Sequence, residues 1–169
     1  MEPSDGEPRW PWRVSVGVGG TMLGGAALNT VLVTTRPELY GALGTWMADL
    51  SPWGLGPLAD LWDATFGEHP RVWGAVVGVG YEAAVGTLAL SHDPRRRVAG
   101  LGGVALFHGG LLAMGLWGWA VPVLAVLAPT TAATARSGQR TRTDASTLRR
   151  GERLPALVPP RGARRTRPR

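Results

Sequence analysis

Long uncharged runs alternate with short charged segments along the chain. A helix needs about 20 apolar residues to cross the hydrocarbon core of a bilayer. The runs 14–35, 72–91 and 98–135 are long enough, and the third is too long for one crossing. We divide it at "LWGWAVP" (116–122), where paired tryptophans and a proline favour an interfacial turn. The pattern predicts an all-α protein, a four-helix transmembrane bundle with spans at about 14–35, 72–91, 98–117 and 119–135.

The charges between these runs predict how the spans are oriented. Cytoplasmic loops of membrane proteins are enriched in Arg and Lys, and "HDPRRR" (92–97) is such a loop. The loop 36–71 carries five acidic residues against two arginines, so we place it outside. With four spans, the segment 1–13 and the tail 136–169 are both cytoplasmic, whereas three spans would leave the basic tail outside. We therefore expect a multi-pass protein of the inner or plasma membrane.

The first uncharged run could also be the apolar core of a cleaved signal peptide. It is longer than such a core, and the segment before it holds three acidic residues, which signal peptides disfavour. We interpret the run 14–35 as a span.

The external loop 36–71 contains two stretches in which apolar residues recur at helical spacing. They are Leu39, Leu43, Trp46 or Met47, and Leu50 in the first, and Leu58, Leu61, Trp62 and Phe66 in the second. Tryptophan prefers the headgroup level of a membrane, so we expect amphipathic helices at the outer interface. A helical hairpin that caps the bundle is the alternative.

The tail 136–169 contains eleven of the eighteen arginines, which account for the net charge of +6. It has little apolar periodicity and several prolines, so we expect it to be disordered. Its charge orients the protein and can contact anionic lipids. We do not expect nucleic acid as a partner, because no aromatic stacking platform accompanies the charge.

Glu82 is the only charged residue of the run 72–91 and lies near its middle. A charge facing lipid at this depth costs at least ~2.5 kcal/mol, so it should face protein. Glycines four residues apart, at 74, 78 and 86, share its helical face and allow another helix to approach closely. We predict that this face contacts the first span.

The other spans offer polar partners for Glu82. The first span has a row of small and polar residues spaced by four, namely Gly17, Thr21, Gly25 and Asn29. His108 is the eleventh residue of the third span, as Glu82 is of the second. Tyr81 and Thr87 are near Glu82 in sequence, and Tyr40 follows the first span. The expected polar core comprises Glu82, Asn29, His108, Tyr40 and Tyr81.

Two interpretations of this polar core remain open. It could bind a quinone, lipid or small solute or relay a proton, or Glu82 could hold helices together by hydrogen bonding. For His108 alone we favour a structural role. The chain has no cysteine, and it contains no metal-ligand cluster, nucleophile motif or phosphate-binding loop. No catalytic residue and no cofactor site is therefore indicated by motif.

The order of these residues resembles the DoxX-like family of small four-helix integral membrane proteins. The resemblance is carried by Asn29, "RPELY" (36–40), Glu82 with Gly86, and "RRR" (95–97). It implies that Asn29, Pro37, Tyr40 and Glu82 occupy the family's corresponding places. It also implies a link to quinone-dependent or oxidative-stress membrane chemistry. The long, tryptophan-rich external loop departs from the family pattern.

Three functions are compatible with these features. We expect an accessory or small-ligand-binding membrane subunit that is not an enzyme on its own. A quinone-linked oxidoreductase component is the first alternative, and it would need a redox partner subunit. A proton or small-solute transporter is disfavoured, because one carboxylate and no inverted repeat make a poor pathway.

Overall fold

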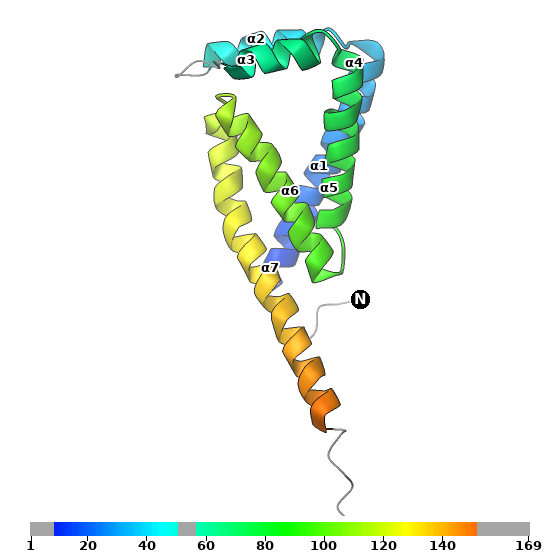
Figure 1. The fold of residues 1–169 in the computed structure, drawn as a ribbon, viewed down its shortest axis with the longest axis vertical. Helices are drawn as coiled ribbons and strands as arrows, with labels where there is room; N and C mark the ends of the chain where they lie inside the picture. The colour runs from blue at the N-terminus through cyan, green and yellow to red at the C-terminus, as the bar shows by residue number, and fades with distance from the viewer. Residues whose placement is uncertain (1–8, 51–56, 152–169) are drawn as a thin grey trace, which may run out of the picture. The chain divides into compact units, whose positions relative to one another are not determined.

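The computed structural model describes residues 9–50 and 57–151, and these residues form helices joined by short turns, without any strand (Figure 1). Residues up to Gly138 form one compact unit, and Gln139–Arg169 form a second. The helices are α1 (Trp10–Thr35), α2 (Leu39–Leu50), α3 (Pro57–Trp62), α4 (Pro70–Trp73), α5 (Glu82–Ala89), α6 (Pro94–Ala113) and α7 (Trp117–Gly151), with π-helical segments η1 (Asp63–Gly67) and η2 (Gly74–Tyr81).

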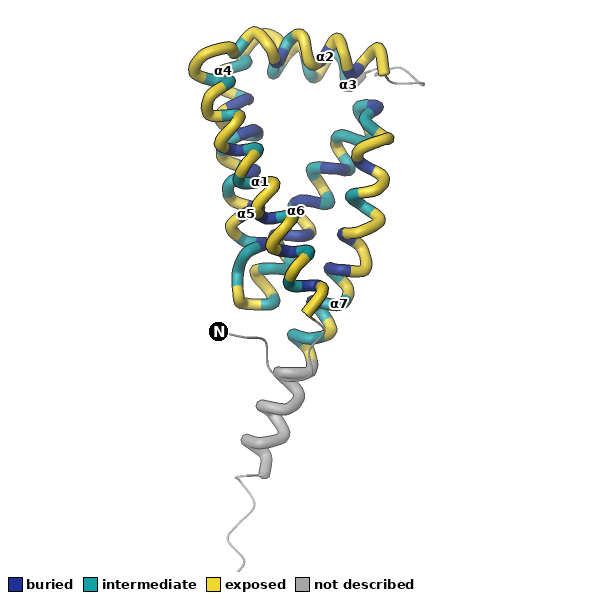
Figure 2. The backbone as a smooth tube through the Cα atoms, turned by 180° about the vertical axis from the view of Figure 1, so that it is seen from behind, coloured by how far each residue is buried: buried dark blue, intermediate teal, exposed yellow. Residues whose placement is uncertain are grey.

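Helix α5 lies between α1 and α6 and continues the direction of α4 and η2 (Figure 1). Helix α7 runs beside α6, while α2 and α3 lie across one end of the long helices (Figure 1). The buried positions face the inside of this arrangement (Figure 2). The buried core is apolar and draws on four helices, with Met22, Val85, Ala89, Leu101, Val104 and Leu127.

Three of the helical stretches are long and apolar enough to cross a membrane. They are Trp10–Thr35, Pro70–Ala89 and Trp117–Gln139. Helix α6, the predicted third span, is not among them, because it begins with three arginines and is rich in glycine. The all-helical fold is confirmed, and the fourth crossing stays a prediction.

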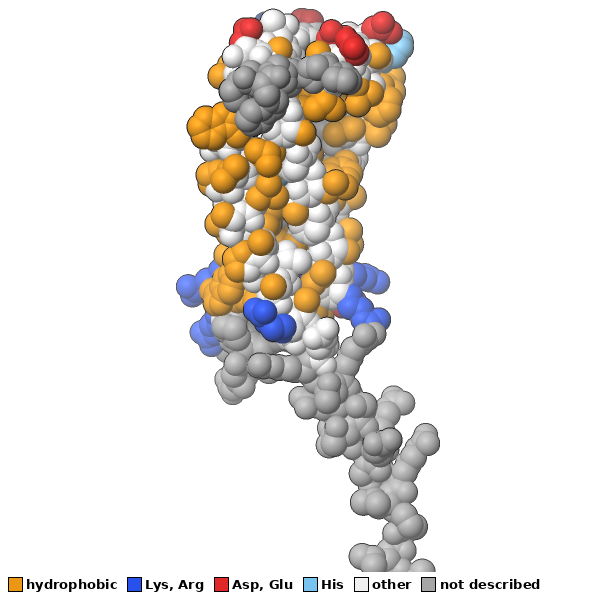
Figure 3. Space-filling view, turned by 60° about the vertical axis from the view of Figure 1, so that its left-hand side comes forward, with side chains coloured by type: hydrophobic (Ala, Val, Ile, Leu, Met, Phe, Trp, Pro, Cys, Tyr) orange, Lys and Arg blue, Asp and Glu red, His pale blue; other side chains and the backbone are white. Residues whose placement is uncertain are grey.

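The outer surface of the long helices is apolar. Leu28, Val76 and Leu106 are 60%, 56% and 72% exposed although each lies within a long helical stretch. Figure 3 shows hydrophobic side chains along the middle of the unit, arginines gathered at one end and acidic residues at the other. This distribution is typical of a protein that places its middle in hydrocarbon and its ends in water.

The long uncharged run does divide into two helices, but the turn lies earlier than predicted. Helix α6 ends at Ala113 and α7 begins at Trp117, so "WGWAVP" is helical and the prolines at 122 and 129 lie inside α7. Gly115 makes the reversal with a φ of 89°, a conformation that glycine adopts without a steric cost. Glycine, and not the Trp-Pro pattern, therefore marks this boundary.

The prediction of a disordered tail is wrong for residues 136–151. Helix α7 continues through Arg136 to Gly151. The sequence contains no proline between Pro129 and Pro155, and its Ala, Arg, Gln and Leu residues favour a helix. The rest of the predicted tail, 152–169, lies outside the described residues.

Both predicted amphipathic segments of the external loop are helical. In α2, Tyr40, Gly44 and Met47 are buried, so Met47 belongs to the packed side of the helix. The remaining predicted row is exposed, with Leu39 at 45%, Leu43 at 37%, Trp46 at 51% and Leu50 at 44%. The loop thus packs on one side of α2 and leaves a second, apolar side uncovered.

Two glycines of α6 provide a matched test of this packing. A Cβ at Gly100 would collide with backbone atoms of Leu88 and Ala89, whereas a Cβ at Gly102 would meet nothing within 4 Å. We expect Gly100→Ala to lower the free energy of unfolding by about 1–3 kcal/mol, because the backbone of Leu88 and Ala89 would have to shift to make room for the added methyl group. Gly102→Ala should be neutral or stabilising by up to about 1 kcal/mol. Unfolding in mixed micelles measures both, and equal effects would contradict the α5–α6 contact.

Candidate functional site

Glu82 takes part in a hydrogen-bonded chain that joins three parts of the fold. It is the first residue of α5 and only 7% exposed. Asn29 of α1 donates from Nδ2 to Glu82 Oε2 over 3.3 Å. Tyr40 of α2 donates from its hydroxyl to Asn29 Oδ1 over 2.6 Å. The structure therefore brings Glu82, Asn29 and Tyr40 together.

An amide suits the middle position of this chain. Asparagine carries one acceptor and two donor hydrogens on a single planar group. It can accept from a phenol, which donates, and donate to a carboxylate, which accepts. Asn29 thus connects a residue in the middle of one helical stretch with a residue of the loop 36–71.

Glycines make room for each member of the chain. A Cβ at Gly25 would collide with the carboxylate of Glu82, and a Cβ at Gly78 would lie 2.7 Å from Cγ of Asn29. A Cβ at Gly74 would lie 2.9 Å from the ring of Tyr40. Gly86 contacts Gly19 of α1 in the same way. The prediction that Gly74, Gly78 and Gly86 mark the face toward the first helix is confirmed.

The matching row predicted on the first helix is correct only in its C-terminal half, at Gly25 and Asn29. Gly17 has no neighbour within 4 Å of a Cβ position and Thr21 is exposed, while Gly19, Met22 and Ala26 are buried. In a regular α-helix, residues four apart diverge by about 40° with each step. The second stretch keeps its row because η2 is π-helical, and a π-helix holds more residues in each turn.

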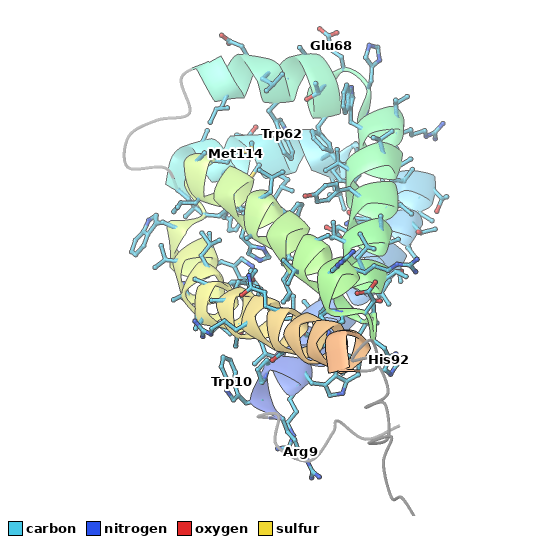
Figure 4. The ribbon with its side chains drawn as sticks, turned by 60° about the horizontal axis from the view of Figure 1, so that its bottom comes forward. Arg9, Trp10, Trp62, Glu68, His92 and Met114 are labelled. Carbon is cyan, nitrogen blue, oxygen red and sulfur yellow. The ribbon has the colours of Figure 1, made fainter. Side chains whose placement is uncertain are left out.

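Aromatic residues of the loop 36–71 hold Tyr40 in place. Trp62 donates from Nε1 to the backbone oxygen of Tyr40 over 3.0 Å. Its ring stacks on Phe66 at 4.3 Å, and Phe66 lies 5.7 Å from the ring of Tyr40. Figure 4 shows Trp62 directed into the space between the two loop helices, whereas Glu68 points away from it. Burial, and secondarily the nearby Glu82, raises the pKa of Tyr40, so its hydroxyl stays protonated and can donate.

The sequence did not identify Trp62 and Phe66 as residues that position the site. Their spacing suggested only an amphipathic helix. Gly44 was the available signal, because it lies one helical turn after Tyr40, and a Cβ there would collide with the indole of Trp62. A glycine inside an otherwise amphipathic helix can indicate the close approach of a large ring.

His108 and Tyr81 are bound to α6 and not to Glu82. The Tyr81 hydroxyl donates to the backbone oxygen of Gly103 over 2.8 Å. His108 Nδ1 lies 2.9 Å from the backbone oxygen of Val104, one turn earlier in its own helix. Thr87 is exposed. Consecutive helical residues point about 100° apart, which explains why Tyr81 faces α6 while Glu82 faces α1.

One oxygen of Glu82 can still accept a hydrogen bond. Among the described residues, Asn29 is the only hydrogen-bond partner of Glu82, and it binds Oε2. No enclosed side-chain oxygen or nitrogen of the described chain lacks a partner. Oε1 is therefore not fully enclosed. No three His, Asp or Glu side chains gather into a metal-binding group in the described residues.

The hydrogen-bonded chain can be tested by a double-mutant cycle. Asn29→Ala and Tyr40→Phe remove neighbouring links of one network, so their effects on unfolding should not add. We expect a coupling free energy of about 0.5–2 kcal/mol. Tyr81→Phe removes a bond to α6 instead, and its effect should add to that of Asn29→Ala. Additivity in both cycles, measured by unfolding in mixed micelles, would contradict the chain.

Comparison with known proteins does not assign a function to this chain. The sequence matches no protein-family model, no curated protein matches it, and no solved structure is similar to it. What the fold and the contacts do show is an all-helical protein in which a buried carboxylate is joined through an amide to a phenol.

Proposed function

We propose that this protein is an accessory or small-ligand-binding subunit of a membrane, with Glu82 at the centre of its polar site. The hydrogen bonds from Tyr40 to Asn29 and from Asn29 to Glu82 carry the proposal. They orient one carboxylate oxygen and leave the other, Oε1, able to accept from a ligand. The ligand would be a largely apolar molecule with a hydroxyl or amine donor.

A purely structural role accounts for less of this arrangement. A single hydrogen bond between α1 and α5 would suffice to fix their packing, and amides or hydroxyls provide such bonds without the cost of a buried carboxylate. Instead, Gly25 leaves space for a carboxylate, and Trp62 and Phe66 hold the phenol at the other end of the chain. The space for the carboxylate and the packing around the phenol together favour a site that recognises a ligand.

The resemblance to DoxX-like proteins remains a proposal, and it suggests a quinol as one ligand. Three of the four residues that carry it, Asn29, Tyr40 and Glu82, are in hydrogen-bond contact. A quinol is apolar and has hydroxyl donors that suit Glu82 Oε1. In that case the protein would act as a quinone-linked component, and a partner subunit would have to supply the redox centre.

For the topology, we propose four crossings of the inner or plasma membrane with both termini in the cytoplasm. Helix α6 has 20 residues, packs against α5, and connects to α7 through a turn of three residues, Met114–Leu116. It therefore lies alongside helices that are apolar enough to span. The basic end would face the cytoplasm and the acidic end the outside (Figure 3). The basic tail could contact anionic lipids of the same leaflet.

Substitution of Glu82 separates ligand binding from packing. Glu82→Gln keeps an oxygen that accepts from Asn29, and Glu82→Leu keeps neither oxygen. We expect Gln to preserve folding but weaken ligand retention about tenfold or more, because it loses the charge and half of its acceptors. Mass spectrometry of protein extracted with native lipids measures the bound molecules. Unchanged retention in both variants would overturn the proposed site.

Reporter fusions test the proposed topology. A reporter active only outside the membrane should be silent when fused after Arg97 or at the C-terminus, and active when inserted after Leu50. The basic loop at 95–97 should stay inside because positive charge resists translocation. An active C-terminal fusion with a silent fusion at 97 would show that α6 and α7 do not both cross.

A further inference from the structure

A second cluster of side chains lies at the opposite end of the long helices from Tyr40. The guanidinium of Arg97 lies 4.6 Å from the centre of the Trp12 ring, and His92 lies 5.2 Å from the same ring. Arg97 also donates from Nε to the backbone oxygen of Ser91 over 3.0 Å and from Nη2 to that of His92 over 3.3 Å. These contacts fix the turn between α5 and α6 against the start of α1.

The same turn also lies against α7. A Cβ at Gly138 would lie 3.1 Å from Cβ of Pro94, the first residue of α6. Arg95 and Arg96 follow Pro94 directly, Arg13 follows Trp12, and Arg136 precedes Gly138 by half a turn. Arg13, Arg95, Arg96 and Arg136 are all exposed. Three helices therefore present arginines at one end of the unit (Figure 3).

The charge of this end is poorly balanced by the described residues. Its exposed arginines include Arg13, Arg95, Arg96 and Arg136, and Asp93 is the acidic residue described beside them. Asp93 accepts from the backbone of Arg95 and lies 3.9 Å from Arg96 in an exposed pair. Exposed pairs of this kind contribute little. Among the described residues, these arginines leave an excess of positive charge at the border of the apolar surface.

Apolar surface adjoins these arginines along α1. Trp10 is 44% exposed and Val16 is 41% exposed, on either side of Arg13 in sequence. Figure 4 shows Arg9, Trp10 and His92 together at this end. A molecule that combines an anionic headgroup with acyl chains would meet arginine and apolar side chains at the same time. An anion in free solution would use only the arginines.

We propose that the arginines exposed at this end, Arg13, Arg95, Arg96 and Arg136, bind headgroup phosphates of anionic phospholipids, and that the Trp12–Arg97 contact holds α1 and α6 in position for them. Guanidinium groups recognise phosphate through paired hydrogen bonds, which sets this site apart from general attraction of a membrane to the tail. This site shares no residue with the Glu82 site. A negative result for lipid binding would therefore leave the proposed function unchanged.

Lipid titration of the full-length protein in neutral detergent tests the site. The probes are phosphatidylglycerol and, as a control, phosphatidylcholine with identical chains, and native mass spectrometry counts bound lipid. We expect preferential retention of phosphatidylglycerol and an affinity about 30-fold lower for the variant R95Q/R96Q, as for two arginines near an anionic surface. The matched control R149Q/R150Q removes the same charge from the tail and should lower the affinity less than R95Q/R96Q does.

Three outcomes would overturn the proposal. Equal losses in R95Q/R96Q and R149Q/R150Q would show unspecific attraction. Competition by inorganic phosphate at the concentration of the lipid would show a site for free anions. Full affinity of R95K/R96K would show that charge alone suffices, because lysine lacks the planar fork. If R95Q/R96Q does not fold, R13Q on α1 replaces it, with the same expected direction and the same controls.

Discussion

The close contact between α1 and the stretch from η2 to α5 determines the rest of the structure. Glycines line this contact from both sides, so the helices approach until the carboxylate of Glu82 lies against Gly25 and Asn29 against Gly78. Within a bilayer, such approach is favoured by packing and hydrogen bonds, because lipid supplies no hydrophobic drive between helices. The polar site and the helix interface are therefore one feature.

The contact also links the middle of the molecule to its acidic end. Asn29 lies near the end of α1, and α2 begins four residues after Thr35. The chain reverses there, so Tyr40 returns toward Asn29 and the aromatic rings of the loop close over it. Two hydrogen bonds thus connect the loop to Glu82.

Sequence patterns predicted the helical segments and the core of the site. Uncharged length predicted the helices, and the cost of burying a charge predicted that Glu82 faces protein. The grouping with Asn29 and Tyr40 followed from the family resemblance as well. His108 and Tyr81 could not be excluded in this way, because their bonds to the α6 backbone depend on which side of a helix each residue faces. Depth in the span and nearness in sequence, which suggested His108 and Tyr81, do not determine that side.

The structure also differs from the sequence prediction where backbone geometry decides the outcome. The reversal at Gly115 and the continuation of α7 past Arg136 depend on local backbone preferences more than on hydropathy. The same is true of α2, whose buried side, with Tyr40 and Gly44, is determined by the packing of Trp62 and Phe66.

The π-helical segment η2 has a consequence for sequence change. It covers eight uncharged residues and ends directly before Glu82. A π-helical turn contains about one residue more than an α-helical turn. Deletion of one residue from this segment could therefore be absorbed by conversion to α-helix, with Gly74 and Glu82 both kept on the side of α1. The same deletion in α5 or α6 would rotate every later residue by about 100°. Length variation should thus be tolerated immediately before the carboxylate and excluded immediately after it.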